Sequence, residues 1–147
     1  MTTYYKFLCA DGTGPYSSAP WLLPADGQPG AWMPAVTGDL VLCENGYHAC
    51  TERDLLTWLG ATLYELEFDG EVVAGDDKVV GRCARLLRRI DTWNARTIRL
   101  FAADCAEHVL HLFEQRYPDD IRPRQAIAAA RAFARGEIDQ QALTAAG

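Results

Sequence analysis

Eight consecutive residues gather most of the reactive side chains in the first half of the chain. They are residues 43–50, Cys-Glu-Asn-Gly-Tyr-His-Ala-Cys, and they include the only histidine before residue 100. Sulfur and imidazole nitrogen are typical zinc ligands, but a tetrahedral site would need a fourth ligand, from Cys9 or Cys83. The spacing is not that of a CxxC pair. We therefore predict no metal here, and expect a reduced cysteine beside a histidine that is hydrogen-bonded to the backbone.

A second group of reactive side chains, Cys105, His108 and His111, lies within two turns of one expected helix. Cys105 falls in the apolar stripe of that helix, so we expect it in the core, with His108 at the border and His111 towards solvent. A single helix offers too few ligands for a closed metal site. The pattern favours a structural role over metal binding.

Acidic, basic and aromatic residues supply the remaining candidates. Glu65 and Glu67 share one face of an expected strand, where paired carboxylates could do acid–base work or simply form its solvent face. Arg85 and Arg88 could bind an anion, or could balance nearby aspartates. The residues that we expect to line a binding site are Tyr47, His48, Trp32, Trp58, Arg85 and Arg88.

Composition and charge limit the class of protein. The chain has 147 residues, of which 49% are hydrophobic, enough for an ordinary core. Its net charge of −6 is uneven: residues 1–81 carry −9, residues 82–99 carry +5 and residues 100–147 carry −2. Such a dipolar surface can steer a partner. The acidic pI of about 5.0 argues against general nucleic-acid binding, which usually requires a basic face.

The same data point to a protein of the cytoplasm. No apolar run approaches the roughly 18 residues of a membrane span, and the first residues lack the pattern of a signal peptide. Five cysteines, an odd number at irregular spacings, suggest reduced thiols. We expect a cytoplasmic protein with no cofactor and no contact with membranes.

The sequence predicts mainly strands in the first half of the chain, and these strands must position the candidate residues. Alternation and turn residues predict one helix, at residues 52–59, preceded by Thr51 as its N-cap. Asp69-Gly70 is typical of a hairpin turn, and residues 16–38, rich in Pro and Gly, form a long loop. The expected strands are residues 4–9, 21–23, 39–43, 47–50, 62–68, 71–74 and 78–87.

The second half predicts helices. Apolar residues recur every three or four positions over residues 92–116, a Pro-containing second helix runs from residue 122 to about 135, and residues 138–145 form a third. Strands followed by helices indicate an α+β fold. We expect a small mixed or antiparallel sheet in residues 1–90 and a helical extension in residues 91–147. The extension is expected to form a helical hairpin that packs on the sheet, so that the chain is one globular unit.

Residues 4–90 resemble an uncharacterised protein family of bacteriophages and prophages. The resemblance is carried by Tyr5-Lys-Phe, a Gly/Pro/Trp loop, Gly46-Tyr-His-Ala-Cys50 and Glu65-Leu-Glu67. The layout of a Gly-aromatic strand, a helix and another strand is also similar to that of ADP-ribosyltransferase-like folds. That similarity implies that Tyr5, Tyr47 or His48 contacts NAD and that Glu65 or Glu67 acts on the substrate.

Residues 100–139 resemble a helical family of immunity proteins from toxin systems. The motifs are Phe101-Ala-Ala-Asp-Cys-Ala-Glu-His-Val-Leu110, Pro118-Asp119, Arg122-Pro-Arg124 and Ala129-Ala-Arg131. Such proteins neutralise toxins by binding them. A structural role for the motif is the alternative: Pro123 suits the first turn of a helix, and Arg122 or Arg124 could bind Asp104 or Glu107 across the helix pair.

These observations favour a phage- or mobile-element-associated accessory protein that binds another protein, as an immunity factor or inhibitor. The alternative is an ADP-ribosyltransferase-like enzyme, or a degenerate NAD-binding relative, with Tyr5, His48, Glu65 and Glu67 as its catalytic residues. A deep pocket that holds Tyr5, His48 and a carboxylate would favour the enzyme. Whether any catalysis occurs stays open from the sequence.

Overall fold

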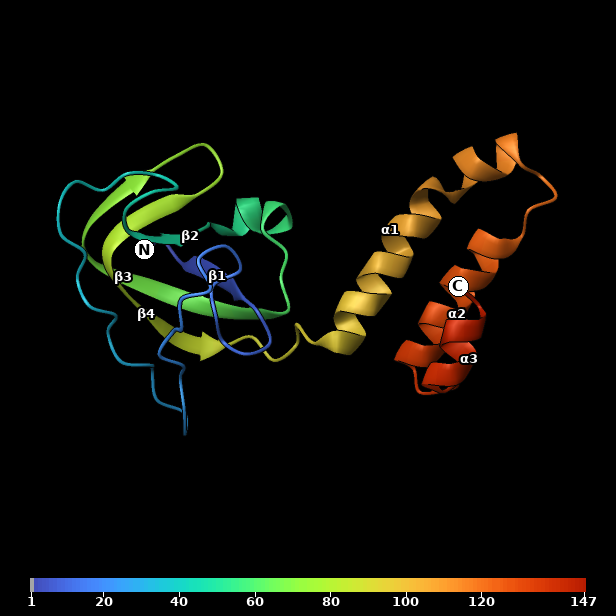
Figure 1. Ribbon diagram of the computed structural model, residues 1–147, viewed down its shortest axis with the longest axis horizontal. Coiled ribbons are helices and arrows are strands. Elements are labelled where there is room, and N and C mark those ends of the chain that lie inside the picture. The colour runs from blue at the N-terminus through green and yellow to red at the C-terminus, as the bar shows by residue number, and fades with distance from the viewer. Residues whose placement is uncertain (1) are drawn as a thin grey trace. The chain divides into compact units, whose positions relative to one another are not determined.

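The computed structural model describes residues 2–147, and the chain divides into two compact units at Asp91 and Thr92. The first, here the sheet unit, contains all the strands, and the second, the helical unit, contains the three α-helices (Figure 1). The predicted α+β class is confirmed. No helix among residues 2–147 combines the length and apolar composition that crossing a bilayer requires.

The sheet unit is built on one antiparallel sheet, with the strand order β1-β3-β4-β2. Figure 1 shows that the two longest strands, β3 and β4, are strongly curved. Just after β2, the backbone N–H groups of Cys50 and Tyr5 each donate to the other's carbonyl oxygen at 2.9 Å. The last strand is thereby joined back to the first at one position. The strands are β1 (Tyr4–Leu8), β2 (Tyr47–Ala49), β3 (Thr62–Ala74) and β4 (Val79–Arg89).

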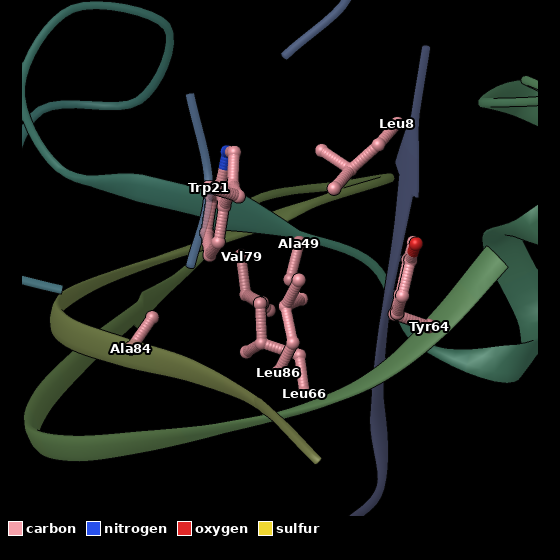
Figure 2. Packing of buried hydrophobic residues seen from close by; sticks show 8 residues of the cluster. All are labelled: Leu8, Trp21, Ala49, Tyr64, Leu66, Val79, Ala84 and Leu86. Atoms are coloured by element: carbon pink, nitrogen blue, oxygen red, sulfur yellow. The ribbon is translucent and has the colours of Figure 1, made fainter. Parts of the chain in front are cut away.

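The curled sheet encloses the core of this unit. Figure 2 shows its buried side chains gathered between the strands: Leu8, Trp21, Ala49, Tyr64, Leu66, Val79, Ala84 and Leu86. Leu66 and Leu86 are register partners and are almost fully buried. A β-carbon at Gly81 would overlap the ring of Phe68, which packs against this cluster. The core therefore requires glycine at that position of β4.

The predicted hairpin turn at Asp69-Gly70 is wrong. Strand β3 continues through both residues, and its register against β4 shifts between Asp69 and Val72. Gly70, at φ +83°, occupies this β-bulge, where an extra residue increases the local twist. The chain reverses later, where Gly75 N–H donates to the Lys78 carbonyl oxygen at 2.8 Å.

Three other predicted elements also differ from the structure. Residues 21–23 and 39–43 form no strand, because their backbone makes only isolated bridges and turns. The short helix is a 3-10 helix, η1 (Glu52–Thr57), and Thr51 precedes it without a side-chain cap. The hydroxyl of Thr51 instead donates to the Asp54 carboxylate at 2.8 Å.

The helical unit follows the sequence prediction closely. Asn94 and Asp139 begin the first and third helices, and each side chain accepts a hydrogen bond from a backbone N–H three residues on. Pro123 lies in the first turn of the second helix, as predicted. The helices are α1 (Ala95–Arg116), α2 (Arg122–Ala134) and α3 (Gln140–Ala145).

The face of α1 that the helical unit buries is not the predicted one. Ala103 and Leu110 are its buried residues, whereas Cys105, Val109 and Leu112, which the apolar pattern assigned to the core, are exposed. Arg131 of α2 forms ion pairs on this side of α1. The expectation that Cys105 is a core residue is therefore wrong.

The ion pairs between the two long helices also involve partners other than those expected. Arg131 pairs with Asp104 and Glu107, and Arg124 pairs with Glu114 at 2.8 Å. Arg122 binds Asp120, two residues before it, through both carboxylate oxygens. These exposed pairs fix the alignment of α1 and α2 rather than contributing much stability.

Candidate functional site

The sheet unit contains a cavity of about 760 Å³. It lies where β1 and β2 run beside each other beyond the single bridge between Tyr5 and Cys50, and residues of both strands line it. The loop that carries Trp21, the turn at residues 43–46, and Trp58 and Lys78 complete its walls. Its volume is that of a typical small-molecule site. Aromatic side chains form part of its lining: Tyr5, Phe7, Tyr16, Trp21, Tyr47 and Trp58.

His48 lies in this cavity as a neutral hydrogen-bond acceptor. Its Nε2 accepts the backbone N–H of Cys43 at 2.7 Å, which leaves the ring proton on Nδ1. Burial, followed by the charge of Lys6, lowers the pKa of His48. Cys43 is held at φ +67°, a conformation uncommon for residues with a β-carbon. The turn thus fixes the ring in place rather than leaving it free for proton transfer.

Lys78 is the more heavily engaged of the two lysines in the cavity wall. Its Nζ lies 3.2 Å from Cys43 Sγ, 3.7 Å from an Asp77 carboxylate oxygen and 4.6 Å from the centre of the Trp58 ring. The hydrogen bond to Cys43 is the main cause that raises the pKa of Lys78. This ammonium is therefore held by three groups of the protein itself.

Lys6 is a site residue that the sequence reasoning missed. Successive side chains of a strand alternate between faces, so Lys6 shares the face of β1 that carries Tyr4 and Leu8, both part of the core packing. Its Nζ lies 5.3 Å from the centre of the Trp21 ring. Burial lowers the pKa of Lys6 to about 8, partly offset by Cys50. The sequence contained a signal for this residue, because Lys6 lies between Tyr4 and Leu8 on the same face of the strand.

Cys50 is an unreactive thiol by comparison. Its side chain is buried, and its Sγ lies 3.7 Å from the carbonyl oxygen of Tyr5. Burial, followed by the charge of Asp54, raises the pKa of Cys50 to about 11. Because the thiolate is the nucleophilic form, this cysteine contributes to packing rather than to chemistry.

The structure brings together about half of the candidates from the sequence. Tyr5, Tyr47, His48 and Trp58 all line the cavity. The hydroxyl of Tyr47 donates to the Pro34 carbonyl oxygen at 2.7 Å, which fixes its ring. The remaining candidates do not line the cavity: Trp32, Glu65, Glu67, Arg85 and Arg88.

Those remaining residues form cross-strand pairs between β3 and β4. Arg88 Nε donates to Glu65 at 2.8 Å, and Arg85 binds Glu67 while its guanidinium stacks 4.6 Å from the centre of the Trp32 ring. The expected balance of these arginines by Asp76 and Asp77 is therefore wrong. Both glutamates have cationic partners within the sheet.

Metal ligands are not gathered anywhere in the described part of the chain. Residues 2–147 hold no group of three or more His, Cys, Asp or Glu side chains that could bind a metal ion. Cys105, His108 and His111 are all exposed along α1. His48 and Cys50 lie near each other in the sheet unit, but the nitrogen of His48 that could bind a metal already accepts a hydrogen bond.

The enzymatic alternative makes a direct prediction. Its criterion was a deep pocket with Tyr5, His48 and a carboxylate: the cavity is lined by Tyr5, His48 and Glu44, whereas Glu65 and Glu67, the carboxylates predicted to be catalytic, do not line it. We expect 1 mM NAD to leave the melting temperature of the protein unchanged, because a ligand raises it only by binding the native state. A rise of several degrees that is lost in His48→Ala would restore the transferase-like interpretation.

The comparisons with known proteins concern the other unit. Residues 88–147 match a family described as "Imm-5 like putative immunity protein". This match covers less than half of the chain and includes all three α-helices. It overlaps the segment that resembles phage proteins only at residues 88–90, and that resemblance has no further support. No curated protein and no solved structure matches the chain. The helical unit is thus similar to immunity-type proteins.

Proposed function

We propose that this chain is an immunity-type protein that neutralises a toxin by binding it, with the helical unit as the binding element. The observation that carries the proposal is the family match of residues 88–147. The partner is a protein because immunity of this type acts through association rather than through chemistry on a small molecule. The phage or mobile-element origin of the chain is part of the same proposal.

An apolar seam on α1, exposed from Ala102 to Leu112 and half-buried at Ile98, supports this proposal. The seam consists of Ile98, Ala102, Cys105, Val109 and Leu112, which are spaced alternately by four and three residues. That spacing places side chains along one line of a helix and is the pattern by which helices pack against each other.

The exposure of the seam makes it available to a partner. Val109 is 52% exposed and Leu112 is 60% exposed, large fractions for aliphatic side chains on a helix whose other face is buried. Contiguous exposed apolar residues of this kind mark protein–protein contact sites. We propose that the toxin covers the α1 seam.

The test is protection of growth by seam variants. Cells that express the proposed toxin partner should grow when the intact chain is co-expressed, and should stop growing when it carries Leu112→Asp. A buried charge without a partner costs several kcal/mol at an interface, so we expect at least a hundredfold loss of affinity. Equal expression and an equal melting temperature of the variant and the intact chain would show that Leu112→Asp leaves the protein folded.

The matched control is Leu56→Asp. Leu56 is 69% exposed and belongs to η1 of the sheet unit, so the same chemical change is made at an exposed leucine outside the α1 seam. This variant should protect cells as well as the intact chain does. Protection that survives Leu112→Asp, or that is lost in Leu56→Asp, would contradict the assignment of the seam.

A further inference from the structure

The cavity of the sheet unit holds a cation that forms no ion pair within residues 2–147, not even with Glu44, the carboxylate of the lining. This cation is Lys6, which lies among core positions of β1 and on the wall of the cavity. The ring of Trp21, 5.3 Å from Nζ, is the contact that compensates part of the charge. A partly buried ammonium in this state favours a bound anion.

The other polar groups of the cavity do not compete for that anion. His48 is neutral and its Nε2 already accepts a hydrogen bond from Cys43. Lys78 is engaged by Cys43, Asp77 and Trp58. Within residues 2–147, Lys6 is thus the one cation of the lining that forms no ion pair, and Glu44 adds a negative charge to the same lining. The cavity therefore matches an anion with a single charge better than a phosphate monoester with two.

The apolar walls define the rest of the ligand. Trp21 and Tyr47 meet edge to face, with ring centres 5.4 Å apart, and both line the cavity together with Phe7 and Met33. Aromatic walls with rigid positions favour a flat, aromatic ligand body. The hydrogen bond from Tyr47 to the Pro34 carbonyl oxygen holds one of these rings in place.

We propose that the cavity of the sheet unit binds a small aromatic carboxylate, whose carboxylate group pairs with Lys6 Nζ and whose ring packs against Trp21 and Tyr47. This site is separate from the α1 seam and does not depend on the proposed toxin binding. The low pKa of Lys6 fits an ammonium that is desolvated by burial.

The test compares acids with their neutral amides. Calorimetric titration at pH 7 would use indole-3-acetate against indole-3-acetamide, and phenylacetate against phenylacetamide. We expect at least one acid to bind the intact chain ten times more tightly than its amide. In Lys6→Met, a variant of similar length without charge, the acid and its amide should bind equally.

Lys78→Met is the matched control, since the chain contains only these two lysines. It should keep the preference for the acid. With lysine labelled at 13Cε, two side-chain signals are expected, and only that of Lys6 should move when the acid is added. No preference for either acid in the intact chain would overturn the proposal, and so would a preference that is lost in Lys78→Met but kept in Lys6→Met.

Discussion

Replacing Lys6 by methionine should raise the free energy of unfolding at pH 7 by about 2 to 3 kcal/mol, since a pKa difference of one unit corresponds to about 1.4 kcal/mol. Burial lowers the pKa of Lys6 from 10.5 to about 8 in the folded protein. The folded state therefore disfavours the charged form, and methionine removes that cost while keeping the apolar stem. The lost contact with Trp21 offsets a small part of the gain.

The pH dependence of this gain has a definite sign. The pKa of Lys6 is lower in the folded protein than in the unfolded chain. The charge of Lys6 therefore destabilises the folded state fully below about pH 8, and this destabilisation disappears as the pH rises towards 10.5. The difference between Lys6→Met and the intact chain should therefore shrink between pH 7 and pH 10. Cys50, His48 and Lys78 remain in both proteins, so taking the difference largely cancels their titration.

Chemical unfolding followed by tryptophan fluorescence measures this difference, because three of the four tryptophans belong to the sheet unit. Lys78→Met is the control, because the pKa of Lys78 is shifted in the opposite direction. Contacts in the folded state raise the pKa of Lys78, so replacing this residue should not stabilise the protein. A Lys6→Met variant that is no more stable than the intact chain at pH 7 would show that Lys6 is fully hydrated.

Leu66→Ala should lower the free energy of unfolding of the sheet unit by about 3 kcal/mol, within the usual range for leucines in well-packed cores. Leu66 is 1% exposed and lies between Tyr4 of β1 and Leu86 of β4 in the register of the sheet. The curled sheet cannot collapse easily onto the vacated space, because its strands are joined on both sides.

The same tryptophan signal measures the effect of Leu66→Ala. Leu22→Ala is the matched control, because Leu22 belongs to the same unit but is 46% exposed. We expect Leu22→Ala to lower the free energy of unfolding by less than about 1 kcal/mol, since much of the Leu22 side chain stays in water in the folded state. Equal losses from the two variants would mean that the enclosed core of Figure 2 does not dominate the stability of this unit.

Local patterns predicted the long elements well. Three- and four-residue spacing located α1, Arg122-Pro-Arg124 located the start of α2, and alternation located the first half of β3. The pattern failed at Asp69-Gly70, because a glycine at positive φ serves a β-bulge as readily as a hairpin turn. It also chose the wrong face of α1, because Val109 and Leu112 are as apolar as the buried Leu110.

The candidate site was predicted in part because several of its residues are close together in the sequence. Residues 43–50 hold both Cys43 and His48, so their contact follows from one tight turn. Tyr5 joins them only through its backbone pairing with Cys50, 45 residues away, which no local pattern encodes. Lys6 was missed although alternation along β1 places it on the face of Tyr4 and Leu8, because only the folded sheet shows that Lys6 also lines the cavity.

The proposed function is tested most directly by titrating the purified chain against its toxin in a calorimeter. The account predicts a one-to-one complex that Lys6→Met leaves intact, since the cavity lies outside the α1 seam, and that Leu112→Asp weakens at least a hundredfold while the melting temperature stays the same. A complex with equal affinity for Leu112→Asp, or protection of cells without any complex, would contradict binding through the helical unit.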